Sequence, residues 1–179
     1  MSRVRALVAL VAVLVLAPAT ARADFPPRLD HRGALGISPE VGGEEADFLR
    51  VQSNDVQASV STRLTLGLEL TLGLGTEGNE IVVLGRYLYN RSDPGGAAGV
   101  AYRGYFGRDE LKTYFQGGIK ADTAPRFAIG PWAQLGVMYE LSSLVGVFAQ
   151  AELSAEISQG IRVGLGISGG VQFRTYVLE

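Results

Sequence analysis

The sequence predicts an all-β fold: an up-and-down antiparallel β-barrel of about eight strands that crosses a membrane. The segment 64–74 alternates leucine with a small or polar residue over eleven positions. Because successive side chains of a strand point to opposite faces, every leucine of this segment lies on one face. A tilted strand of about ten residues is also long enough to cross the hydrocarbon layer of a bilayer. Later segments alternate in the same way, and turn-forming residues separate them.

The N-terminal segment 1–23 is typical of a secretory signal peptide. Two arginines near its start provide positive charge, residues 6–17 form the apolar run, and residues 21–23 read Ala-Arg-Ala, a small-x-small cleavage site. The apolar run is short for a transmembrane helix, so a cleaved signal is preferred over an uncleaved N-terminal anchor. The mature chain is then expected to begin at Asp24.

Composition excludes several function classes. The 179-residue chain has no cysteine, which excludes disulfides, thiolate metal sites and lipid attachment to cysteine. Loss of Arg3, Arg5 and Arg22 with the signal peptide lowers the number of basic residues from 16 to 13, against 18 acidic residues. The mature chain is therefore acidic, and no nucleic-acid partner is expected. Its length fits a single domain.

We expect the barrel domain to occupy residues 48–179. Residues 24–47 are rich in proline, glycine and acidic residues, so they are interpreted as an N-terminal extension, with room for a short extra strand at 33–37. A ten-strand barrel would need that short strand and a break in 48–60 near residues 53–55, and eight strands are preferred. The expected strands are 48–60, 64–74, 80–90, 97–107, 111–121, 127–141, 144–157 and 160–177.

The polar face of these strands indicates a barrel lumen rather than a soluble surface. In residues 145–157 the odd positions are apolar, and the even positions are mostly small or polar. A soluble β-sandwich also alternates, but its exposed face would carry more charge than the glycine, serine, threonine and glutamine present here. The crowded interior of a narrow barrel accepts small residues and isolated charges. The charged residues expected to face the lumen are Glu69, Arg86, Arg103, Lys112, Lys120, Glu140, Glu152, Glu156, Arg162 and Arg174.

These lumen charges are the candidate functional positions, and they are expected to pair because an unpaired buried charge is costly. Glu152 and Glu156 are expected to neutralise Arg162 or Arg174 on an adjacent strand. The two carboxylates lie about 13 Å apart along a strand that rises about 3.3 Å per residue. Paired glycosidase carboxylates lie closer, about 5–9.5 Å apart. A structural role is therefore preferred over catalysis.

No catalytic residue, metal site or cofactor is expected. The only histidine, His31, lies in the predicted extension, so a Ser-His-acid arrangement would have to place it at a barrel rim. The glycines at 164 and 166 lie in a strand that no helix follows, so they do not form a phosphate-binding loop. The protein is therefore not expected to be an enzyme.

The alternating strands, the short turns, the cleavage site at 21–23 and the segment 170–177 together resemble the small outer-membrane β-barrel proteins of Gram-negative bacteria, the OmpA/OmpX-like eight-strand class. The resemblance is one of pattern and covers nearly the whole mature chain. It implies residence in the outer membrane, the lipid bilayer as partner, insertion by the outer-membrane assembly machinery, and a monomer. The chain departs from the class by ending in Val-Leu-Glu at 177–179 rather than in an aromatic residue.

The preferred function is a non-enzymatic outer-membrane barrel with a structural role in the envelope. Eight strands leave an interior that Trp132 and the Arg and Glu side chains would largely fill. A narrow channel or small-ligand transport barrel, with selectivity set by those charges, is one alternative. A soluble periplasmic β-sandwich or lipocalin-like binding protein is a second alternative. A hydrolase embedded in the barrel is the least favoured.

Overall fold

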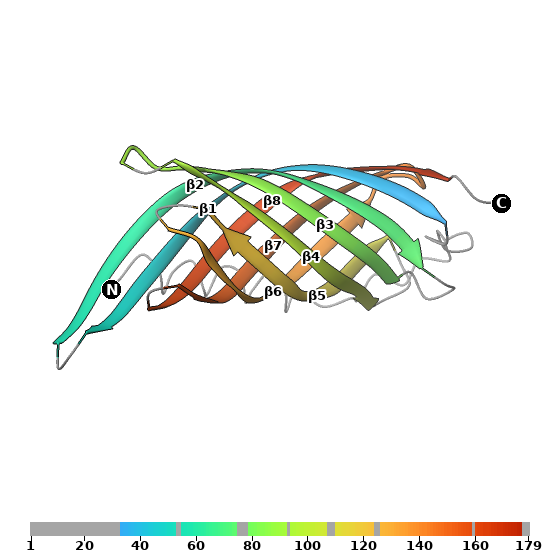
Figure 1. The fold of residues 1–179 in the computed structure, drawn as a ribbon. Coiled ribbons are helices and arrows are strands. Elements are labelled where there is room, and N and C mark those ends of the chain that lie inside the picture. Colours follow the sequence, from blue (N-terminus) through green and yellow to red (C-terminus); the bar gives the residue numbers. More distant parts are fainter. Residues whose placement is uncertain are drawn as a thin grey trace.

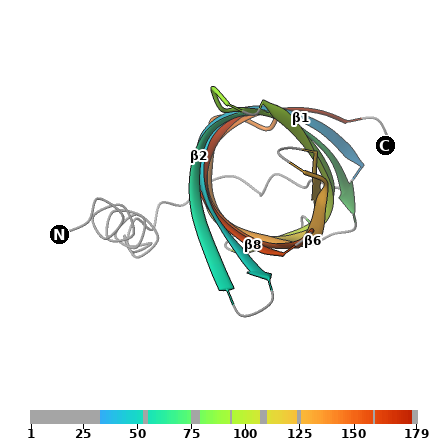
Figure 2. The same cartoon turned by 60° about the vertical axis from the view of Figure 1, so that its left-hand side comes forward.

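Eight antiparallel strands form one closed barrel in the computed structural model of the chain. The structure describes residues 33–52, 55–74, 79–92, 94–106, 110–123, 126–158 and 160–176. The strands are β1 (Ala34–Gln52), β2 (Asp55–Leu74), β3 (Asn79–Tyr89), β4 (Gly95–Phe106), β5 (Leu111–Asp122), β6 (Ala128–Glu140), β7 (Val145–Ile157) and β8 (Ile161–Tyr176). Each strand pairs with its neighbours in sequence, and β8 pairs with β1 to close the sheet (Figures 1 and 2). The predicted all-β, up-and-down barrel is confirmed.

Several predictions fall on other parts of the chain. The signal peptide at 1–23, His31 and the ending at 177–179 lie outside the described residues. They stay predictions from the sequence. Within the described chain, no helix is long and apolar enough to cross a membrane.

The first strand begins earlier than the sequence suggested. β1 starts at Ala34, so the predicted N-terminal extension is wrong from that residue on, and the short strand expected at 33–37 is the beginning of β1. The expected strand 48–60 is also wrong, because its first residues end β1 and its last residues begin β2. In β1, proline, glycine and acidic residues make the alternation of apolar and polar residues hard to recognise. The barrel therefore has eight strands rather than ten, and it starts at residue 34 rather than 48.

Apolar side chains cover the outside of the barrel. Burial alternates residue by residue along β3 and β7. On the outward positions, Val100, Ile119 and Leu153 are 58%, 61% and 52% exposed. A soluble protein buries most such residues, whereas a membrane barrel presents them to lipid. Because the sheet is closed, the β-sandwich alternative is excluded. The apolar side chains on the outside of the barrel also argue against a soluble lipocalin-like barrel.

β1 and β2 continue past the rim of the barrel as a two-stranded hairpin. Pairing of β1 with β8 ends at Leu49, and pairing of β2 with β3 begins at Leu64. Beyond these rows, the described parts of β1 and β2 pair with each other alone (Figures 1 and 2). We call this end of the barrel the hairpin end. The opposite end, where β1 begins and β8 finishes, is the terminal end.

Two prolines lie inside strands, at rows where the backbone ladder is interrupted. The pairs between β1 and β8 skip Ser38 and Pro39, and the pairs between β6 and β7 skip Gly130 and Pro131. Proline has no N–H to donate to a ladder, which explains both breaks. A Cβ on Gly170 would come within 2.1 Å of the Pro39 carbonyl oxygen, so glycine permits this close approach. The register is the same on both sides of each break, and the inward and outward faces therefore continue through it.

Candidate functional site

The barrel interior holds fifteen buried charged side chains among the described residues, seven cationic and eight acidic. All ten charged residues that the sequence assigned to the lumen are at most 8% exposed: Glu69, Arg86, Arg103, Lys112, Lys120, Glu140, Glu152, Glu156, Arg162 and Arg174. Sequence reasoning missed the other five, which are Glu40, Glu44, Arg63, Glu80 and Asp122. The candidate site is therefore an ion-pair network, which divides into three clusters along the barrel.

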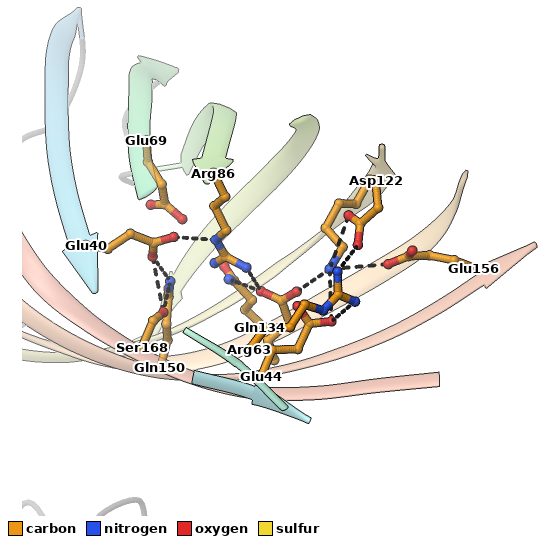
Figure 3. Close-up of polar contacts among 12 residues, drawn as sticks. Glu40, Glu44, Arg63, Glu69, Arg86, Asp122, Gln134, Gln150, Glu156 and Ser168 are labelled. Atoms are coloured by element: carbon orange, nitrogen blue, oxygen red, sulfur yellow. Dashed lines mark hydrogen bonds and ion pairs between the residues drawn. The ribbon is translucent and has the colours of Figure 1, made fainter. Parts of the chain in front are cut away.

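The central cluster is built around Arg86 of β3. Its members are Glu40, Arg86, Gln134, Gln150, Glu152 and Ser168 (Figure 3). Arg86 donates to Glu40 of β1 through Nε and to Glu152 of β7 through Nη1. Gln150 Nε2 donates to Glu40 Oε2 at 2.7 Å, and Gln134 Nε2 donates to Glu152 Oε2 at 2.9 Å. One arginine thus joins strands from different sides of the lumen.

The terminal-end cluster is dominated by directional hydrogen bonds from Arg103 of β4. Arg103 donates to Glu69 of β2 through Nη2, and to Glu80 of β3 through Nη1 at 3.3 Å. Its Nε donates to Gln116 Oε1 at 2.7 Å, and its guanidinium carbon lies 4.7 Å from the ring centre of Tyr114. A planar guanidinium used in this way fixes the orientation of each partner. The charged members of this cluster are Glu69, Glu80, Arg103, Lys112, Glu140 and Arg174.

Arg174 of β8 forms the second half of the terminal-end cluster. Its Nη1 donates to Glu140 Oε1 at 2.7 Å, and Lys112 Nζ lies 2.8 Å from Glu140 Oε2. The Tyr105 hydroxyl donates to Glu80 Oε2 at 3.0 Å, so this tyrosine faces the lumen. Each carboxylate at the terminal end is therefore fixed by specific donors.

The hairpin-end cluster is held by ion pairs that its members share. It contains Glu44, Arg63, Lys120, Asp122, Glu156 and Arg162, as Figure 3 shows in part. Lys120 Nζ lies 3.3 Å from Glu156 Oε1 and 3.8 Å from Glu44 Oε1. Arg162 Nη2 pairs with Asp122 and, at 3.1 Å, with Glu44 Oε1. Arg63 lies 3.7 Å from Asp122. Every carboxylate here faces at least two cations.

The three clusters are connected along the barrel. Lys120 Nζ donates to Glu152 Oε1 at 2.8 Å and joins the hairpin-end cluster to the central cluster. The Tyr114 hydroxyl donates to Gln150 Oε1 at 2.6 Å and joins the terminal-end cluster to the central cluster. In a low-dielectric interior such connected groups stabilise one another, and separating them is costly.

The lumen has little empty space around the central cluster. An apolar patch of Val82, Leu84, Ala101 and Trp132 fills one side. The Arg86 guanidinium lies 5.9 Å from the centre of the Trp132 ring. A cavity beside Arg86 has a volume of about 10 Å³, far smaller than the space that organic ligands occupy. The described side chains at this level hold charge in place, and the cavity beside Arg86 is too small for an organic substrate.

The structure pairs the predicted charges only partly as expected. Glu156 contacts Arg162 at 3.2 Å, as the sequence suggested. Glu152 contacts Arg86 and Lys120 rather than a cation of β8, so that expectation was wrong. The reason is geometric: in a narrow barrel, long side chains reach across the lumen to strands that are not neighbours.

Four of the five missed residues lie where the sequence was misinterpreted, whereas Glu80 lies in the expected strand 80–90. Glu40 and Glu44 belong to the segment that was interpreted as an extension, and Arg63 and Asp122 lie in predicted turns. The available signal was the parity of residues 35–41, where the apolar residues are two positions apart and outward. Following that parity would have placed both glutamates inside the barrel.

Metal ligation does not explain the acidic side chains of the lumen. Among the described residues, no group of His, Cys, Asp or Glu is arranged to hold a metal ion. The buried carboxylates instead face Arg and Lys side chains.

The sequence matches no protein-family model and no curated protein, but solved structures share its fold. Neisserial surface protein A is 13% identical, with a TM-score of 0.63 over 80% of this chain and 100% of its own. The N-terminal β-barrel domain of OprF from Pseudomonas aeruginosa is 12% identical, with a TM-score of 0.58 over 80% and 98%. The outer-membrane protein OprG from Pseudomonas aeruginosa is 10% identical, with a TM-score of 0.54 over 84% and 100%. The chain therefore has the fold of the small eight-stranded outer-membrane β-barrels.

Proposed function

We propose that this protein is a non-enzymatic barrel of the outer membrane that supports the structure of the cell envelope and is not an open pore. One contrast carries the proposal: the outer face is apolar, while an ion-pair network fills the lumen. The apolar face suits lipid, and the network neutralises the buried charges. The outer-membrane barrels that share its fold support the same location.

Aromatic side chains near both ends of the barrel support its placement in a bilayer. Tyr87 and Phe127 are exposed near the hairpin end, and Phe106 and Tyr139 near the terminal end. Membrane barrels carry such aromatic girdles at both interfaces. With an even number of strands both ends of the barrel chain lie at the terminal end, so we assign this end to the periplasm and the hairpin to the outside. Export by the signal peptide, insertion by the outer-membrane assembly machinery and a monomeric state belong to the same proposal.

The central cluster supports a closed lumen. Arg86 bridges Glu40 and Glu152, which come from strands β1 and β7. A continuous path would have to separate these buried charges. Removing one partner of a buried ion pair costs about 3–5 kcal/mol, so the closed arrangement is strongly favoured.

Planar-bilayer recording of the purified protein tests the closed lumen. We expect no stable conductance steps from the wild type, and small steps from the double variant Arg86→Ser with Glu152→Ser, which lacks the central bridge. Arg91→Ser changes an exposed residue after β3 and is the matched control. Stable steps from the wild type would contradict the closed lumen and favour a narrow channel whose inward Arg and Glu side chains select ions.

A deletion strain tests the envelope role. Loss of the protein is expected to make cells more sensitive to detergents and to large antibiotics that an intact outer membrane excludes. Expression of the wild type or of Arg91→Ser is expected to restore resistance. The shift in gel migration on boiling reports whether each variant is folded in the membrane. Unchanged sensitivity of the deletion strain would contradict the structural role.

A further inference from the structure

A small cavity lies where the central cluster meets the hairpin-end cluster. Side chains or backbone of β1, β2, β3, β7 and β8 line it, among them Glu44, Thr65, Arg86, Glu152, Gly166 and Ser168. Its volume is about 10 Å³, which is the space of a single water-sized sphere. The cavity therefore has room for one water molecule.

Two charged side chains that line this cavity each have one polar atom without a hydrogen-bond partner. Arg86 Nη2 is a buried donor, and Glu44 Oε2 is a buried acceptor. Both side chains are only 4% exposed. The other atoms of these groups are engaged: Arg86 binds Glu40 and Glu152, and Glu44 Oε1 accepts from Arg162. Buried polar atoms of charged groups are rarely left unpaired, because an unmade hydrogen bond is costly there.

The chemistry of the lining selects the occupant. A cation in the cavity would face the Arg86 guanidinium, and an anion would face the Glu44 carboxylate, so either ion meets a like charge. An apolar occupant would satisfy neither unpartnered atom. Water can accept from a guanidinium and donate to a carboxylate at the same time. The hydroxyl groups of Thr65 and Ser168 add polar partners around the same space.

We propose that one buried water molecule occupies this cavity, accepting a hydrogen bond from Arg86 Nη2 and donating one to Glu44 Oε2. It is a structural part of the lumen, as buried waters in polar cavities generally are. It adds a second connection between the central and hairpin-end clusters, beside the contact of Lys120 with Glu152. The lumen plug is then hydrated at one defined point rather than dry.

A crystal structure of the wild-type protein at a resolution that shows ordered water tests the proposal directly. We expect a density peak within hydrogen-bonding distance of both Arg86 Nη2 and Glu44 Oε2. Absence of density between these two atoms, with both side chains placed as described, would overturn the proposal.

The variant Gly166→Ala tests the same site by its effect on stability. A Cβ at this position lies 3.7 Å from the Cβ atoms of Glu44 and Glu152 and 3.3 Å from the Gly43 carbonyl oxygen, so the methyl group enters the cavity region. Gly169→Ala is the steric control, since its Cβ would lie 3.0 Å from the Phe148 carbonyl oxygen, an even closer backbone contact on the same strand.

Displacing the water leaves two charged atoms unsatisfied, whereas filling an empty cavity stabilises a protein. We therefore expect Gly166→Ala to raise the unfolding equilibrium constant about tenfold more than Gly169→Ala does. Urea titration in phospholipid vesicles, followed by the fluorescence of Trp132, measures both values. A loss no larger than that of Gly169→Ala would mean a dry cavity and would refute the proposal.

Discussion

The two ends of the lumen contain the same number of charges but arrange them differently. The terminal-end and hairpin-end clusters each have three cations and three carboxylates. At the terminal end, Arg103 is the one cation that contacts Glu69 among the described residues. At the hairpin end, Arg63, Lys120 and Arg162 all face Asp122.

The two ends therefore stabilise their buried charges in two different ways. The terminal end depends on directional hydrogen bonds, and each guanidinium nitrogen of Arg103 has an assigned acceptor. The hairpin end depends on proximity: both oxygens of Asp122 and of Glu156 lack a geometrically good hydrogen bond, although cations surround them. We therefore expect the first arrangement to be sensitive to shape and to the loss of one residue, and the second to tolerate substitution.

The largest expected effect comes from removing one arginine at each end. Arg103→Met is expected to lower the free energy of unfolding by about 3–5 kcal/mol. The reason is that the Glu69 carboxylate stays buried, and no other cation among the described residues contacts it. Arg162→Met is expected to cost about half as much, because Lys120 and Arg63 still face the same carboxylates. Urea unfolding in phospholipid vesicles measures both losses. Equal losses of stability in the two variants would contradict the proposed difference between the two ends, because the remaining cations at the hairpin end would then not compensate for the lost arginine.

Strand parity predicts which residues face the lumen, but it does not predict their partners. The leucines of 64–74 were sufficient to place Glu69 inside. The contact of Arg86 with Glu152 joins residues 66 positions apart, and it depends on strand tilt and register, which alternation does not encode. β1 was missed for a different reason: Pro39 and its neighbouring glycines and glutamates have the composition of a loop.

Exchanging lysine and arginine sharpens the comparison at constant charge. Arg103→Lys is expected to cost about 1–3 kcal/mol, because an ammonium group cannot contact Glu69, Gln116 and Glu80 in one plane. Lys120→Arg at the hairpin end is expected to cost less, because four carboxylates share this cation. The same urea titration compares the two. A larger loss from Lys120→Arg would show that the hairpin end is the more shape-dependent cluster.

The smallest expected effect comes from a single hydroxyl group. Tyr114→Phe removes the hydrogen bond to Gln150 that joins the terminal-end cluster to the central cluster, at a cost of about 0.5–1.5 kcal/mol. Tyr139→Phe is the matched control, because its hydroxyl donates to Glu110 at an exposed position and its loss is expected to be close to zero. Equal losses from the two variants would mean that the Tyr114 link contributes nothing beyond an exposed hydrogen bond.

The pairing of β1 with β8 has a consequence for the proposed insertion of the protein into a membrane. Ala34 lies opposite Tyr176, so the rows that seal the wall join the two ends of the described chain. Contacts between residues so distant in sequence are slow to form, because chain entropy opposes them. Until they form, each of these strands exposes a row of amide and carbonyl groups that hydrocarbon cannot solvate. If the barrel lies in a bilayer as proposed, we therefore expect its insertion and its closure to be coupled rather than to proceed one strand at a time.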